Sequence, residues 1–346
     1  KENKEMATKT AKKKGLSSAE KMDRTAAILT TKFLEQVSNP DGSLKSVSDL
    51  GGWSKPWIMR GEKRPHNVAS GTAYKGANSF LLGLVAMDHD AAIFSTFKGW
   101  QGLGLRVIKG ESGTPFIKWN VNYVCVEGCK GWHHKREDVK CGHSSKKVIS
   151  ANSFTVFGYW QVTADSETNA AAIPGVDFPY HKDFQPSDLN PTDIDLTSAD
   201  KVKNHFLKTG VNMTDTDDQA YYFPARDIVN VAPANQFVSI ESYASTMAHE
   251  LCHWTMGPDR IVRKLSYAAE ELVAELGACV LVSDMNIDHT PMMAEGDNHT
   301  AYLRGWLEPL IKEARTSEGS RVIWDACDKA AKAAAFVADL TGPFIK

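Results

Sequence analysis

The chain has 346 residues, a formal net charge of −2 and 42% hydrophobic residues, enough for two packed domains and too apolar for a disordered protein. It contains no run of about 18 apolar residues, so we expect no membrane-spanning helix and no membrane partner. Six cysteines are too few for a disulfide scaffold in a chain this long, and the N-terminus has no apolar signal core. We therefore expect a cytoplasmic protein.

Charge is divided unevenly along the chain. Residues 1–164 carry 25 Lys and Arg against 14 Asp and Glu, whereas residues 165–346 carry 15 against 28. A basic half joined to an acidic half suggests that the first half meets a polyanion such as nucleic acid. The alternative is a chance imbalance on solvated surfaces.

The first half begins with a lysine-rich stretch, residues 1–20, which we expect to be a flexible basic arm. Apolar residues at helical spacing predict a helix over 18–38 and a second helical patch over 76–90. Alternating polar and apolar residues predict strands over 114–126 and 147–164.

The second half begins with residues 166–197, which we interpret as an acidic, proline-containing linker. The pattern then predicts a short helix over 198–210 and a strand pair over 219–237. Helical patterns follow at 239–256, 266–283, 297–315 and 321–338. We expect an α+β protein of two domains: a mixed α/β domain over 21–165, with an insertion at 121–150, and a second domain over 198–346.

The sequence His249-Glu250-Leu251-Cys252-His253 has two histidines four positions apart. On a helix they project from one face and can take two corners of a tetrahedral zinc site. Glu250 then lies beside the metal, where it can accept a proton from water and pass it to a leaving amine. This is the HExxH pattern of zinc peptidases.

A third ligand is expected from the next helix, because a catalytic zinc keeps three protein ligands. Glu271 and Glu275 lie one helical turn apart. We assign Glu271 to the metal, and Glu275 to the far nitrogen of a ligating histidine. Glu270 is the weaker ligand candidate. The alternative is an amphipathic helix with solvated glutamates.

Tyr267 lies one turn before Glu271 and is our candidate for stabilising the oxyanion. Arg263, His289 and His299 are rivals for that role. The segment 220–237 could supply an edge strand that pairs with an extended substrate, although an ordinary sheet strand is as plausible.

Three stretches, "AYYFPARDIVNVAPANQF", "HELCHWTM" and "YAAEELVAELGA", resemble the zincin-like domain of ArdC-type antirestriction proteins. The stretches "GWSKPWIMRGEKRPHNVASGTAYKGANSFLL", "FSTFKGWQGLGLRVIKGESGTPFIKW" and "VFGYWQVT" are similar to the single-stranded-DNA-binding domain of that family. These proteins are carried by plasmids and phages and are related to the N-terminal part of TraC primases. The resemblance implies a protein that coats incoming single-stranded DNA and hinders restriction. It also implies a zinc site with His249, His253 and Glu271, and Glu250 as base.

The insertion departs from that family. It offers Cys125, Cys129, Cys141 and His143, with His133 or His134 as substitutes for the last. Two close pairs separated by a loop are typical of small structural zinc sites, so we expect a second zinc at the tip of a hairpin; free thiols are the alternative.

The basic half interleaves cations with aromatic residues, as single-stranded-DNA grooves do. The candidate DNA-binding residues are Trp53, Lys55, Trp57, Arg60, Lys63, Arg64, Tyr74, Lys75, Asn78, Lys98, Trp100, Arg106 and Lys109. For any single tryptophan, a place in the core is the competing interpretation.

Three functions follow. The first is an antirestriction protein that binds single-stranded DNA and carries a gluzincin-like metallopeptidase acting on DNA-bound proteins or restriction enzymes. The second is a non-catalytic DNA-protecting binder whose metal is only structural. The third is a peptidase whose basic half binds protein.

Overall fold

A computed structural model describes most of the chain. The described residues are 16–45, 65–87, 89, 91–127, 133, 141, 143–164, 196–216, 218–237, 239–285, 287, 297–316 and 321–345, with the backbone alone at 164, 196 and 297–304. Six DNA-binding candidates (Trp53, Lys55, Trp57, Arg60, Lys63 and Arg64) lie outside them, as do Cys129, His134, His289 and most of the predicted linker.

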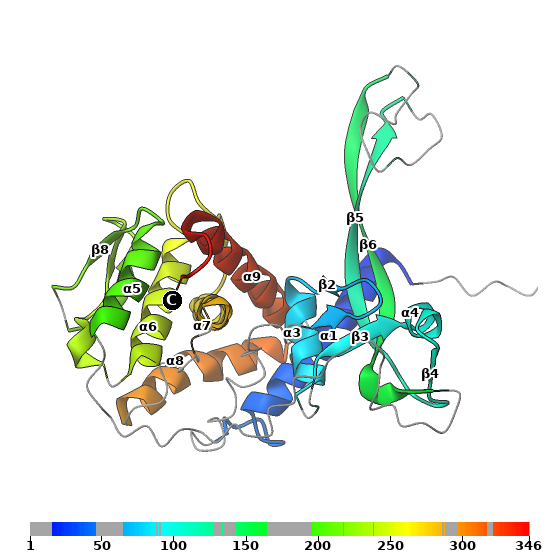
Figure 1. The fold of residues 1–346 in the computed structure, drawn as a ribbon, viewed down its shortest axis with the longest axis horizontal. Coiled ribbons are helices and arrows are strands. Elements are labelled where there is room, and N and C mark those ends of the chain that lie inside the picture. Colours follow the sequence, from blue (N-terminus) through cyan, green and yellow to red (C-terminus); the bar gives the residue numbers. More distant parts are fainter. Residues whose placement is uncertain are drawn as a thin grey trace, which may run out of the picture. The chain divides into compact units, whose positions relative to one another are not determined.

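Helices and strands alternate through the first half, and helices dominate the second (Figure 1). The α-helices are α1 (Ser18–Val37), α3 (Ala77–Val85), α4 (Phe97–Gly102), α5 (Leu196–Leu207), α6 (Ile240–Trp254), α7 (Tyr267–Asp284), α8 (Asp297–Ala314) and α9 (Val322–Thr341). Short 3-10 turns are η3 (Tyr159–Gln161) and η4 (Ala234–Gln236). The strands are β1 (His66–Asn67), β2 (Thr72–Ala73), β3 (Ile93–Thr96), β4 (Leu105–Val107), β5 (Thr114–Cys125), β6 (Ser145–Gly158), β7 (Val162–Ala164), β8 (Asn212–Thr214), β9 (Tyr221–Phe223) and β10 (Ile228–Asn230).

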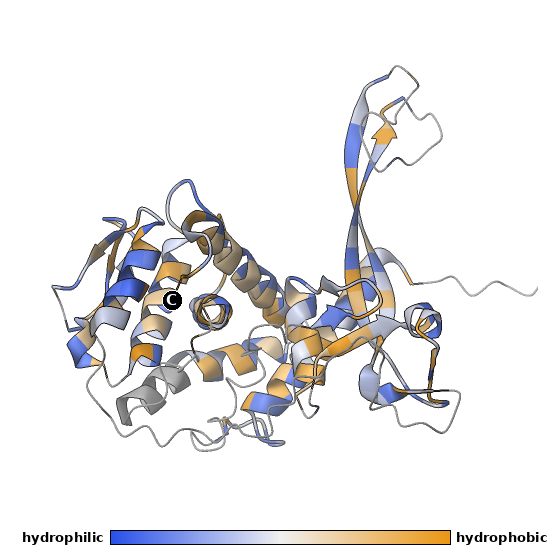
Figure 2. Cartoon of the chain, in the orientation of Figure 1, coloured by the Kyte–Doolittle hydropathy of each residue, from blue (hydrophilic) through white to orange (hydrophobic). Residues whose placement is uncertain are grey.

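The chain divides into two compact units. One comprises Lys1–Thr25 and Ile117–Phe154, and the other comprises Ala26–Phe116 and Thr155–Lys346. The first unit holds most of β5 and β6, along which hydrophilic and hydrophobic residues alternate (Figure 2). Such alternation is typical of a strand pair with one apolar and one polar face.

The strands of the first half form a small mixed sheet in the order β2-β1-β3-β6-β5, with β3 at its centre. β3 runs parallel to β1 and antiparallel to β6, with Phe94 opposite Gly158. Leu82 of α3 packs with Phe94 and Val156 in one apolar cluster, and Ile93 packs with Trp100 in another. The core of the N-terminal half therefore lies on both faces of β3.

The helical part of the second unit is centred on α7, which packs between α6 and α9 (Figure 1). Both α6 and α7 begin at a serine cap: Ser239 accepts a hydrogen bond from the Ser242 N–H, and Ser266 from the Ala269 N–H. Nearly every residue of α7 is buried, including three glutamates. A helix buried all round has no solvated face, so its carboxylates must have partners inside the protein.

Three short strands precede α6. β8, β10 and β9 form a sheet in that order, with β8 parallel and β9 antiparallel to β10. β9 is therefore an edge strand.

The structure confirms the predicted mixture of helices and strands and the order of the long elements. It adds elements that the sequence pattern missed, α4 and the two- to four-residue strands β1 to β4 and β8, and it divides the predicted strand over 147–164 into β6, η3 and β7. Segments this short do not complete a recognisable period, and their pairing partners lie far away in sequence. Among the described residues, no helix is both long and apolar enough to span a bilayer.

Candidate metal centre

His249 and His253 lie on one face of α6, as their spacing requires. Their Nε2 atoms are 3.2 Å apart. His249 is buried, whereas His253 keeps 13% of its side chain exposed. The pair therefore converges on one point that solvent can reach from one side.

Glu271 of α7 approaches both imidazoles. One of its carboxylate oxygens lies 3.5 Å from His249 Nε2 and 3.8 Å from His253 Nε2. Ligand atoms on bonds of about 2.0–2.2 Å at tetrahedral angles would lie roughly 3.3–3.6 Å apart. The three observed separations, 3.2, 3.5 and 3.8 Å, bracket that range, so this donor set fits a single divalent ion.

Each histidine also has a carboxylate at its other nitrogen. Glu275 lies 3.2 Å from His249 Nδ1, and Glu270 lies 3.5 Å from His253 Nδ1. Such a partner accepts the Nδ1–H and leaves the Nε2 lone pair for a metal. The sequence pointed to Glu275 for this role, but it left Glu270 as a weak ligand candidate and gave His253 no partner of its own.

Arg263 holds Glu270 in place. Its guanidinium donates to both Glu270 oxygens, to the Thr255 hydroxyl at 2.7 Å and to the Cys252 carbonyl at 2.7 Å. The Arg263 side chain is fully buried and all three of its nitrogens are engaged. Arg263 is therefore wrong as an oxyanion candidate, because its donors are already used to position a neighbour of the metal ligands.

The ionisation of the cluster follows from its packing. Burial opposes the charge on His249, but the Glu271 and Glu275 carboxylates outweigh burial and raise its pKa to about 10. Burial likewise acts to raise the pKa of Glu271, yet hydrogen bonds from His249 and His253 hold it below its usual range. Two carboxylates beside these imidazoles make the cluster attractive to a cation.

Glu250 lies beside this cluster and is 4% exposed. Burial raises its pKa, opposed by the nearby histidines and by a hydrogen bond from the Tyr222 main chain. The Tyr222 residue belongs to the edge strand β9, and its hydroxyl donates to Asp227. Arg260 binds Asp227 and donates to the Trp254 carbonyl at the end of α6, so β9 is fastened to the helix that carries the histidines.

Tyr267 begins α7 and is 66% exposed. Burial and the Glu271 carboxylate, to which its hydroxyl is hydrogen-bonded, raise its pKa to about 12, so the phenol stays protonated at neutral pH. Its O–H is donated to Glu271, so Tyr267 would serve the oxyanion role that the sequence suggested only after exchanging that acceptor for the substrate oxygen. Of its rivals, His289 and the side chain of His299 lie outside the described residues.

The close approach of α6 and α7 depends on a glycine. A Cβ on Gly277 would lie 2.5 Å from Cys252 Sγ, far inside a normal contact. Cys252 is fully buried, so its sulfur has little space to move. Gly277 therefore sets the helix separation that brings Glu271 to the histidines.

The DNA-binding candidates that the structure describes differ in their exposure to solvent. Lys98, Arg106 and Lys109 are exposed, as a cationic surface requires, and Asn78 is half-buried. Trp100 is wrong as a base-stacking residue: its ring is fully buried and its indole donates to the Phe157 carbonyl. It packs with Ile93 of β3 in the core.

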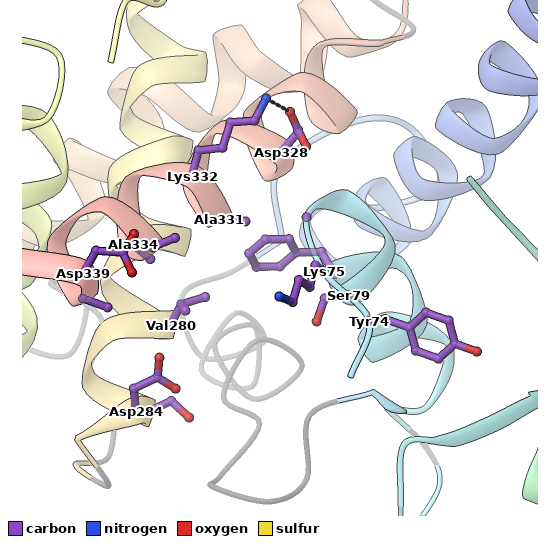
Figure 3. A pocket seen from close by; sticks show the side chains of 15 residues that line it. Tyr74, Lys75, Ser79, Val280, Asp284, Asp328, Ala331, Lys332, Ala334 and Asp339 are labelled. Carbon is purple, nitrogen blue, oxygen red and sulfur yellow. Dashed lines mark hydrogen bonds and ion pairs between the residues drawn. The ribbon is translucent and has the colours of Figure 1, made fainter. Parts of the chain in front are cut away.

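Tyr74 and Lys75 border a cavity of about 530 Å³ between α3, α7 and α9 (Figure 3). Tyr74 also packs edge-on against Phe94 and Phe116 and is half-buried. The Lys75 ammonium points into the cavity, whose wall includes Asp284 and Asp328. Lys75 thus faces carboxylates of the C-terminal helices.

An exposed aromatic residue that the sequence reasoning missed lies on β5. Trp119 is 52% exposed, and its neighbour Lys118 is also exposed. Strand alternation could not have found it, because Trp119 shares a face of β5 with the buried Ile117 and only packing leaves its ring exposed.

In the insertion, the structure brings together three of the predicted zinc ligands. One donor atom each of Cys125, Cys141 and His143 lies within 4.8 Å of the others. His133 does not join this group, although its main chain bridges to Tyr123.

Two families match the chain. Residues 43–157 match the N-terminal domain of anti-restriction factor ArdC, and residues 200–318 match the zincin-like metallopeptidases. The chain therefore combines an ArdC N-terminal domain with a zincin-like metallopeptidase domain. Helices α6 and α7 fall inside the metallopeptidase match, so the candidate metal centre lies within that domain.

Solved structures of ArdC from the R388 plasmid share the fold. The metal-free crystal structure aligns over 93% of this chain and 99% of that one, with a TM-score of 0.58 and 24% identity. The Mn(II)-bound structure aligns over 92% and 99%, with a TM-score of 0.57 and 24% identity.

Curated relatives include two DNA primases TraC of Escherichia coli, 29% and 30% identical over 75% of the chain. The chain spans only 23% and 17% of their length. An uncharacterized protein of Sinorhizobium fredii is 27% identical and aligns over 75% of this chain and 78% of its own length.

Proposed function

We propose that this ArdC-type protein binds single-stranded DNA without sequence preference and hydrolyses peptide bonds at a zinc site formed by His249, His253 and Glu271. The observation that carries the proposal is the convergence of two Nε2 atoms and one carboxylate oxygen at 3.2–3.8 Å beside the buried Glu250. Other divalent ions can occupy such a site, and the named Mn(II)-bound relative is consistent with a cation there.

A bound divalent ion would supply Lewis acidity for the scissile carbonyl. The residues of the chain do the rest. Glu250 accepts a proton from the attacking water and passes it to the leaving amine, a role favoured by its raised pKa. Tyr267 donates a hydrogen bond from its protonated phenol to the oxygen on which negative charge develops.

The substrate is proposed to be an extended segment of protein. β9 is the edge strand of its sheet, and Tyr221 and Phe223 on it are 38% and 43% exposed. An edge strand offers main-chain hydrogen bonds to any extended peptide and therefore selects conformation more than sequence. DNA-bound proteins, restriction enzymes among them, are the proposed targets.

DNA binding is proposed for the basic half. Exposed Lys98, Arg106 and Lys109 would meet phosphates, and Trp119 would stack with a base. Trp119→Ala should weaken binding of a labelled single-stranded oligonucleotide by about 1–3 kcal/mol, measured by anisotropy at fixed salt. Ile149→Ala, which removes an equally exposed side chain from β6 without removing a ring, is the matched control.

The peptidase is tested with Glu250→Gln in the full chain. Wild type should cleave a quenched peptide library or a restriction endonuclease, and Glu250→Gln should lose activity by at least about 100-fold while keeping its metal. Glu241→Gln, on the same helix, should behave as wild type. If Glu250→Gln cleaves as well as wild type, the peptidase assignment fails. If neither cleaves but both protect DNA, the chain is a binder whose metal only organises the second domain.

A further inference from the structure

The β5–β6 hairpin carries a second cluster of metal-binding side chains, which takes no part in the proposed peptidase. We propose that Cys125, Cys141 and His143 bind a structural zinc ion that fastens the two ends of the hairpin loop. Cys125 ends β5, and the other two residues come just before β6 begins at Ser145. One metal ion would therefore join the two strands across the 19-residue loop between them.

The spacing of the donors fits zinc. Cys125 Sγ and His143 Nδ1 are 3.5 Å apart, and the donor atom of Cys141 lies within 4.8 Å of both. Tetrahedral zinc with a Zn–S bond of about 2.3 Å and a Zn–N bond of about 2.0–2.1 Å would separate sulfur from nitrogen by roughly 3.5–3.6 Å. Two thiolates and an imidazole select zinc over the hard cations Mg²⁺ and Ca²⁺, which prefer oxygen.

The main chain around Cys125 supports a thiolate. The Glu127 N–H donates to Cys125 Sγ at 3.3 Å, which stabilises negative charge on the sulfur. The Val126 N–H donates to the Ser144 carbonyl at 2.9 Å, so the two ends of the loop are already held in register. These contacts place the three donors side by side before any ion binds.

Little of the described part of the hairpin end is buried. Of the described residues between 118 and 150, only Asn122 and Cys125 are buried. A two-stranded hairpin without an apolar core is marginal in water, and small elements of this kind are commonly stabilised by a metal. Zinc would stabilise the ordered hairpin by binding to it in preference to the open loop.

A closed structural zinc site has four protein ligands. Cys129 follows Cys125 at a spacing that small zinc sites use, but it lies outside the described residues. The variant Cys129→Ser therefore tests whether the fourth ligand is this thiolate or another donor such as water. Either result leaves the proposal for Cys125, Cys141 and His143 unchanged.

Cobalt substitution in the full chain tests the site separately from the peptidase centre. Thiolate-bound Co(II) gives an intense charge-transfer band in the near ultraviolet, whereas a site of two histidines and a glutamate gives none. The double variant His249→Ala/His253→Ala removes the second source of bound metal. In that background we expect one equivalent of Co(II) with the thiolate band, displaced by one equivalent of zinc.

Cys125→Ser, Cys141→Ser and His143→Ala should each weaken cobalt binding at least tenfold and reduce or shift the band. Cys327→Ser, which removes a buried thiol from α9, is the control and should leave it unchanged. Cys129→Ser should reduce the band by one thiolate if that residue is the fourth ligand. Absence of the band in the double variant, or a Cys125–Cys141 disulfide in protein purified without reductant, would overturn the proposal whatever the outcome at His249.

Discussion

The two candidate metal-binding clusters of this chain are built in opposite ways. The cluster at His249 lies between two helices that are buried almost throughout, with carboxylates at the outer nitrogens of both histidines. The cluster at Cys125 lies at the end of a hairpin, and Cys141 and His143 are exposed. The first has a protein core to hold its ligands, whereas few of the described residues around the second are buried. We therefore propose that a metal acts as a reagent in the first cluster and as a structural support in the second.

The largest expected effect is loss of a ligand at the helical cluster. Glu271→Ala should weaken metal binding by at least about 100-fold, because no other carboxylate of the cluster can replace an inner ligand without leaving its own histidine. The helices should persist, since α7 is held by apolar packing. Isothermal titration measures the zinc affinity, and circular dichroism measures the helix content. Glu308→Ala, an exposed change on α8, is the control. Unfolding of Glu271→Ala would contradict the contrast between the clusters.

Metal removal should affect the stability of the two clusters differently. A chelator should increase hydrogen exchange and proteolysis in the hairpin end, near Cys125 and Cys141, while α6 and α7 remain protected. Exchange measured by mass spectrometry on full-length protein, with and without zinc, gives the comparison. Equal loss of protection in both regions would mean that the helical cluster also depends on its metal to fold.

Gly277→Ala tests how far the helix separation controls the first cluster. The added methyl would meet Cys252 Sγ, so we expect a loss of about 1–3 kcal/mol in unfolding free energy and weaker zinc binding. Cys252→Ala removes the obstructing sulfur and should restore both in the double variant, with thermal unfolding and zinc titration as the readouts. If the double variant is no better than Gly277→Ala alone, the sulfur is not the obstacle.

The smallest expected effects concern the outer carboxylates. Glu275→Gln and Glu270→Gln should each weaken zinc binding by about 10–100-fold. Glu270→Gln also leaves the buried Arg263 without its anion, so it should cost stability that Glu275→Gln does not. Chemical denaturation distinguishes them: equal stabilities would show that Arg263 is satisfied by Thr255 and the Cys252 carbonyl alone.

The sequence by itself determined which residues project together along one helix. His249 and His253 share a face because four residues make about one turn, and Glu271 and Glu275 share one for the same reason. The long helices and the alternating strands of the hairpin were also predictable, since each completes its own period within a continuous segment.

Only the tertiary structure decided what meets across elements. Arg263, Glu270 and His253 form a chain of contacts from a loop, one helix and another, and no local pattern relates them. Trp100 is buried and Trp119 is exposed. The sequence shows an aromatic residue at both positions, but only packing determines which ring faces water. Local periodicity is a property of the backbone, whereas partners and exposure depend on how distant segments fill the same space.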